Sequence, residues 1–163
     1  MSTPAEDKLV AYLRKLQALP ASNSSSLSYI QKIYDDPPRQ DSTKGSFPRL
    51  KVTEISSPSE KAGIGEHSYK YYSVLLEVAC FVAIENGMQE VDGVEYAPEK
   101  AANIIAWDVR KKIEDNEVDI ANDNSHDFVL QNSDFRYGGL DNEYFEAVDV
   151  YKAFAEFNFD MRY

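Results

Sequence analysis

Two histidines and one cysteine are the side chains of this sequence best suited to nucleophilic or metal chemistry. His67 and His126 have no histidine or cysteine partner at the spacing of a zinc site. Cys80 lies inside the apolar run Val78–Ile84, where a free cysteine usually packs as a small hydrophobic residue. A hydrolytic site assembled from distant residues is the alternative that spacing leaves open. From these residue types we predict a protein that is not an enzyme and that needs no cofactor or metal.

The acidic segment 115–127 raises the separate question of calcium binding. Its side-chain oxygens come from Asp119, Asn122, Asp123, Asn124 and Asp127. An EF-hand loop requires a glycine at its sixth position and a glutamate at its twelfth, and no register of this segment provides both. We therefore expect a solvated loop here.

The charge balance argues against direct binding to nucleic acid. The 163 residues include 17 Lys and Arg against 28 Asp and Glu, a net charge of −11. Phosphate backbones are bound by clustered cations, whereas the one basic run, residues 110–112, is followed at once by acids and suits a helix C-terminus. The first fifteen residues do not resemble a signal peptide, and the apolar run Val78–Ile84 is too short to cross a bilayer. We expect a cytosolic protein with no membrane partner.

Two amphipathic helices are predicted. Thr3, Pro4 and Glu6 have the types and spacing of an N-cap, a first helical position and a capping box. One apolar face follows at helical spacing: Leu9, Tyr12, Leu13 and Leu16. A second helix is expected from Pro98 to Glu114, with Trp107 to one side of its apolar stripe. That stripe consists of Ala101, Ala102, Ile105, Val109 and Ile113.

Five strands are predicted, at residues 27–34, 47–55, 68–84, 128–137 and 150–163. The third and the fifth show the clearest alternation, which places Val78 and Cys80 on one core face and Phe157 and Phe159 on another. The element order is α-β-β-β-α-β-β. We therefore expect one α+β domain over residues 1–163, with a mixed or antiparallel sheet of about five strands packed by two helices.

Three long loops are expected near residues 35–46, 56–66 and 86–97, and the last of them contains unexpected apolar side chains. Phe81 and Phe154 add aromatic surface on the second faces of their strands, beyond what a sheet with one buried face needs. Aromatic residues and methionine are enriched at protein interfaces. The predicted subunit or partner contacts are Met88, Val91, Val94, Tyr96, Phe81 and Phe154.

The order of these elements resembles that of a known family. An amphipathic N-terminal helix is followed by two strands around the proline-rich residues 35–38 and the segment Phe47–Val52. A long strand, Tyr69–Ile84, precedes the helix Pro98–Glu114, and the chain closes on the aromatic strand Val150–Tyr163. Over about residues 5–163 this layout resembles the tail terminator, or tail completion, proteins and related neck proteins of long-tailed bacteriophages.

The resemblance implies a structural virion protein, assembled in the host cytoplasm as a homohexameric ring. Such a ring terminates the tail tube and joins it to the head connector, so the implied partners are the tail tube protein and the head connector protein. DNA would pass through the ring without being specifically bound. The alternative is a monomeric acidic binding or inhibitor module of the immunity type, whose acidic surface would meet a basic protein. The two interpretations differ in oligomeric state and in the charge of the partner.

Overall fold

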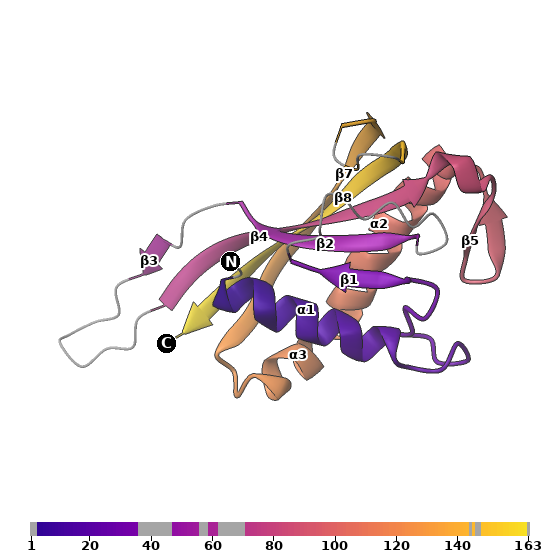
Figure 1. The fold of residues 1–163 in the computed structure, drawn as a ribbon. Helices are drawn as coiled ribbons and strands as arrows, with labels where there is room; N and C mark the ends of the chain where they lie inside the picture. The colour runs from indigo at the N-terminus through magenta and orange to yellow at the C-terminus, as the bar shows by residue number, and fades with distance from the viewer. Residues whose placement is uncertain are drawn as a thin grey trace.

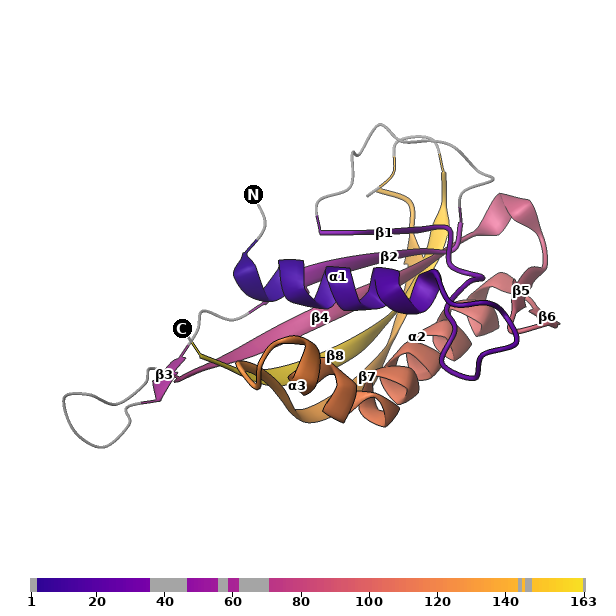
Figure 2. The same cartoon turned by 90° about the horizontal axis from the view of Figure 1, so that it is seen from below.

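A mixed β-sheet carrying three helices on one face forms the body of the protein in this computed structural model (Figures 1 and 2). The structure describes residues 3–35, 47–55, 59–61, 71–143, 145 and 148–162. The α+β class predicted from the sequence is confirmed. Most of the two loops expected near 35–46 and 56–66 lies outside the described residues, as does His67.

The first helix, α1 (Pro4–Gln17), begins as its sequence predicts. The Glu6 amide donates to Thr3 Oγ1 at 3.2 Å, and the Thr3 amide donates to Glu6 Oε1 at 2.8 Å, which completes a capping box. The second carboxylate oxygen of Glu6 accepts a hydrogen bond from the Glu54 amide at 2.6 Å. Glu6 therefore caps the helix and also fixes it to the end of a strand.

Within the described residues the sheet consists of six strands, with the order β1-β2-β4-β8-β7 and with β3 paired to β4. The strands are β1 (Lys32–Tyr34), β2 (Arg49–Glu54), β3 (Ser59–Lys61), β4 (Tyr71–Ala83), β7 (Phe128–Asp141) and β8 (Val150–Arg162). All pairs are antiparallel except β1 with β2, which is parallel. The long central pair places Val78 opposite Ala155 and Cys80 opposite Ala153.

The core lies between one face of the sheet and the helices, as the alternation predicts. Val78 and Cys80 on β4 and Phe157 and Phe159 on β8 have no exposed surface. The helical side is supplied by α1, by α2 (Pro98–Asp115) and by α3 (Glu117–Asp123). Among the described residues no helix is long and apolar enough to span a membrane.

The second face of the sheet is covered at one end by the chain's own side chains. Phe145 makes edge-to-face contacts with Phe47 and Phe81, with ring centroids 5.4 and 5.3 Å apart. Phe81 and Phe154 are 3% and 8% exposed within this cluster. The sequence predicts a partner contact at these two residues because they add aromatic surface to the second face. In the structure that surface is buried within the subunit. Alternation identifies an apolar face but not the distant segment that covers it.

The segment predicted as a third long loop is a β-hairpin. After a single 3₁₀ turn, η2 (Ile84–Asn86), β5 (Gln89–Val91) pairs antiparallel with β6 (Val94–Tyr96). Asp92 and Gly93 connect them with φ of 50° and 83°, the backbone of a type I′ turn. An Asp-Gly pair flanked by two valines is the sequence signal for this turn, and it corrects the loop expectation at 86–97.

Two other expectations are corrected. Residues 27–31 form a turn, and only Lys32–Tyr34 pair as a strand, because Ser26 Oγ accepts a hydrogen bond from the Ser28 amide and donates to the Leu19 carbonyl. The segment expected as a solvated acidic loop contains the helix α3. Ile120 of this helix is buried in the main core.

Two of the acids of α3 are bound by α1. Lys15 Nζ lies 3.0 Å from Asp119 Oδ2 and 2.8 Å from Asp123 Oδ2, and the Tyr12 hydroxyl donates to Asp119 at 2.7 Å. The hydrogen bond from Tyr12, followed by that from Lys15, lowers the pKa of Asp119. Asp119 and Asp123, two of the oxygen ligands considered for calcium, therefore connect α3 to α1.

Candidate functional site

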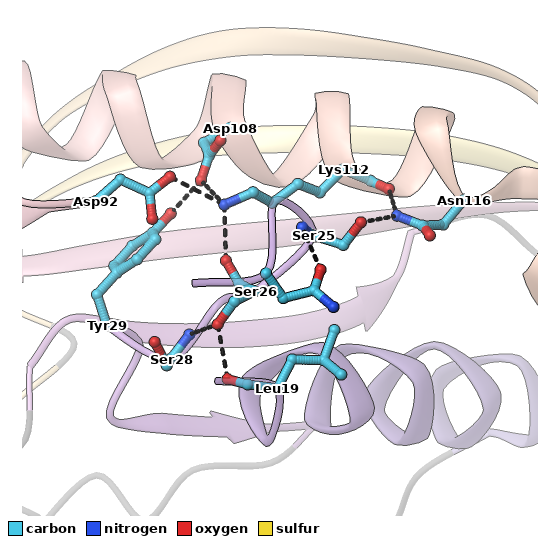
Figure 3. Close-up of polar contacts among 10 residues, drawn as sticks. Leu19, Ser25, Ser26, Ser28, Tyr29, Asp92, Asp108, Lys112 and Asn116 are labelled. Carbon is cyan, nitrogen blue, oxygen red and sulfur yellow. Dashed lines mark hydrogen bonds and ion pairs between the residues drawn. The ribbon is translucent and has the colours of Figure 1, made fainter. Parts of the chain in front are cut away.

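The most deeply buried cation on α2 is Lys112, at the centre of a polar network between three segments (Figure 3). Its ammonium group donates to the Ser26 carbonyl at 2.7 Å, to Asp108 Oδ2 at 2.8 Å and to Asp92 Oδ2 at 3.1 Å. The Lys112 side chain is 7% exposed and that of Asp108 14%. An ammonium has three donors, so every hydrogen bond that Lys112 can make is used.

Tyr29 completes this network from the loop after α1. Its hydroxyl donates to Asp108 Oδ2 at 2.7 Å, and its ring lies 5.6 Å from the Lys112 ammonium. Burial, followed by the charge of Asp108, raises the pKa of Tyr29 well above its usual value, so the phenol stays protonated and donates. The network thus joins the loop, the helix and the turn of the β5–β6 hairpin. The Lys112 and Tyr29 donors have their acceptors within the network, and this arrangement favours a role in positioning the hairpin.

An open cleft of about 750 Å³ lies above this network, between the loop 21–31 and the hairpin. Its lining is rich in serine, asparagine and glutamine, and its charged members are Glu90 and Asp92. Among the described residues that line it there is no cation, cysteine or histidine. The described lining is therefore polar and acidic rather than basic.

The hairpin brings four of the sequence-predicted contact residues together, but it exposes only two of them. Met88 and Val94 are 57% and 52% exposed, whereas Val91 is buried in the main core. Tyr96 is half-buried, with the Lys100 ammonium 5.7 Å from its ring. Of the six predicted contacts, Met88 and Val94 are the ones that stay exposed in the subunit.

A second exposed feature was missed by sequence reasoning: the outer edge of β7. Among the strands that the structure describes, β7 pairs with β8 alone, so its other side faces no strand. One amide of this stretch, that of Phe135, donates to the Asp134 side chain at 2.7 Å. Irregularities in register occur between Leu130 and Asn132 and between Tyr137 and Gly139. The residues between them, 132–137, form a regular edge of about 20 Å.

Exposed aromatic and aliphatic side chains flank this edge. Tyr137 and Leu140 are 68% and 58% exposed, and the Tyr137 ring packs edge-to-face on Phe135 with centroids 4.8 Å apart. Trp107 of α2 is 49% exposed. We call Trp107, Phe135, Tyr137 and Leu140 the edge patch.

Helix geometry places Trp107 beside β7. At about 100° per residue, Asn103, Trp107, Arg110 and Glu114 fall on one stripe of α2. The stripe meets β7 on both sides of Trp107, because Arg110 donates to Ser133 Oγ at 3.0 Å and Asn103 lines a small hollow together with Tyr137. The sequence signal for the patch was Trp107 itself, a large aromatic residue off the apolar stripe of its helix.

The uncovered part of the second sheet face is charged. Arg136 of β7 lies 2.6 Å from Glu77 and 3.0 Å from Glu156, with its guanidinium 4.0 Å from the Phe154 ring centroid. These ion pairs cross three adjacent strands. The edge patch, on the helix side of β7, is therefore more apolar than this charged face of the sheet.

The side chains first considered for chemistry are dispersed. Cys80 is fully buried, and burial, followed by the charge of Asp108, raises the pKa of its thiol, so it is protonated at neutral pH. His126 lies in the turn after α3 with a φ of 62°. In the part of the chain that the structure describes, no three His, Cys, Asp or Glu side chains converge on a metal-sized site.

Comparison of the sequence with models of known protein families gives no match, and comparison with curated proteins gives none either.

Proposed function

We propose that this chain is a structural subunit that assembles with copies of itself into a ring in the neck of a bacteriophage. The ring would terminate the tail tube and join it to the head connector. The observation that supports self-assembly is the outer edge of β7 with the edge patch beside it. The location in a phage neck rests on the resemblance of the element order expected from the sequence to that of tail terminator proteins.

The argument for an interface at β7 is physical. An exposed strand edge is a template for pairing with another chain, and monomeric proteins usually shorten, charge or cover such an edge. Here the regular part of the edge lies beside Trp107, Tyr137 and Leu140, which are between 49% and 68% exposed. Exposed aromatic clusters of this kind mark interaction surfaces, since tyrosine and tryptophan are enriched at interfaces. A second copy can satisfy the backbone groups and bury the aromatic rings together.

The charge of the chain is compatible with a ring through which DNA passes. Each subunit carries a net charge of −11, and a closed ring multiplies that value by its number of copies. An acidic channel would repel DNA phosphates and let the duplex slide without being bound. Closed rings need head-to-tail contacts between two different patches of the same chain.

Replacing Tyr137 with lysine should abolish self-assembly, because a charge would be buried beside the paired edge. The matched control is Ile55→Lys. Ile55 is 43% exposed and follows β2, which two strands separate from β7. Sedimentation velocity of the two variants and of the unaltered protein is the measurement. Assembly of Tyr137→Lys to the same extent as Ile55→Lys would contradict an interface at β7.

A further inference from the structure

We propose that the edge patch of one subunit receives the β5–β6 hairpin of the next subunit, in a head-to-tail contact. This inference rests on the proposed self-assembly and deepens it, since it names both halves of the interface. Four observations support it: the positions of the two surfaces, their apolar side chains, their charges and the anchoring of the hairpin.

The two surfaces lie on different sides of α2. Trp107 is on the stripe that faces β7, whereas Lys112, which binds the hairpin turn through Asp92, is five residues further on. Five residues of an α-helix correspond to a rotation of about 140° around its axis. Both views of the ribbon place the hairpin and β7 on different sides of α2 (Figures 1 and 2). A subunit with complementary surfaces on two sides can form head-to-tail contacts, which give a ring where the rotation between subunits closes.

Apolar side chains are available on both surfaces. The hairpin presents Met88, just before β5, and Val94, the first residue of β6, and each is more than half exposed. The edge patch presents Trp107, Tyr137 and Leu140. Methionine and aromatic rings pack favourably, and a hairpin strand can pair with the β7 backbone by strand addition.

Charge explains why a hairpin is the better occupant than a second edge patch. Glu90 and Glu95 stand directly opposite each other in the hairpin, where two like charges are destabilising. Neither forms an ion pair with a described residue, and both are exposed. Beside the edge patch, Lys111 lies 5.5 Å from the Trp107 ring and contacts no carboxylate in the described part of the chain. Docking the hairpin on the patch would bring these acids to a cation.

The hairpin is fixed before it meets a partner. Lys112 holds the side chain of Asp92 in the turn, and the same ammonium is bound by Asp108 and Ser26 (Figure 3). Val91 is inserted in the core below. A pre-ordered hairpin loses little conformational entropy on binding. The Lys112 network is thus a positioning element for the contact.

Mixed cysteine variants test this contact. We would prepare Val94→Cys and, separately, Leu140→Cys and Tyr137→Cys, with Ile55→Cys as the control partner. The native Cys80 is fully buried and does not compete. Under mild oxidation, a mixture of Val94→Cys with either β7 variant should form an intermolecular disulfide, seen as a dimer on a non-reducing gel. Val94→Cys alone, or mixed with Ile55→Cys, should form at least about tenfold less.

Charge reversal gives a second, independent readout. Glu95→Lys and Lys111→Glu should each raise the concentration needed for assembly by about tenfold, and the doubly reversed chain should recover much of that loss. Assembly of the unaltered protein without the mixed disulfide and without a charge effect would overturn this pairing and leave the proposed self-assembly standing. An unaltered protein that stays monomeric would overturn both.

Discussion

Replacing Lys112 with methionine is expected to lower the free energy of unfolding by about 3 kcal/mol. The substitution keeps the apolar stem of the side chain but removes the ammonium group. Asp108, 14% exposed, then loses its cation, and the buried Ser26 carbonyl loses its donor. Chemical denaturation followed by circular dichroism gives the difference directly.

The control for this variant is Lys100→Met, on the exposed side of the first turn of the same helix. Lys100 is exposed and its ammonium lies 5.7 Å from the half-buried Tyr96 ring, so the change should stay within about 0.5 kcal/mol. Adding Asp108→Asn to Lys112→Met should recover part of the loss, because it removes the buried charge that was left unpaired. A loss below about 1 kcal/mol for Lys112→Met would show that the network does not hold the hairpin, and the positioning role would have to be withdrawn.

Gly138→Ala is expected to cost about 3 kcal/mol and to weaken assembly as well. A Cβ atom at this position would lie 2.1 Å from the Lys152 carbonyl oxygen, a backbone atom that cannot rotate away. Relief requires that β7 move away from β8 at the irregularity next to Tyr137. That shift would displace the edge patch.

The neighbouring Gly139 provides the matched control for this prediction. A Cβ atom there meets nothing within 4 Å. Gly139→Ala should therefore leave stability unchanged or raise it by up to about 1 kcal/mol, through the lower entropy of the unfolded chain. Thermal unfolding of both variants, with sedimentation for assembly, distinguishes them. Equal stability of the two would contradict the close approach of Gly138 to β8.

The parts of the fold that follow from local pattern were predictable. Thr3 and Glu6 have the spacing of a capping box, and the structure forms it. The alternation around Val78 and around Phe157 identified the two long central strands and their core faces. In each case the signal lies within a few residues of the feature that it predicts.

The features that were missed depend on partners distant in sequence. The sequence places Lys112 at the C-terminus of a helix but does not indicate that Asp92 and Ser26, 20 and 86 residues away, bind its ammonium. Phe81 was assigned to a partner surface because nothing local indicates that Phe145 covers it. The outer edge of β7 is a property of strand order, which alternation does not encode. The hairpin is the exception, since Asp92-Gly93 was a local signal that went unused.

The mass of the unaltered protein in solution tests the central claim, self-assembly into a ring, most directly. Light scattering after size exclusion, over a concentration series, is expected to show one closed species of six times the 18.5 kDa subunit mass, unchanged in size as the concentration rises. Negative-stain microscopy of that species should show rings. A mass of 18.5 kDa at every concentration would contradict self-assembly, and tight, salt-dependent binding of that monomer to a basic protein would favour the inhibitor module instead.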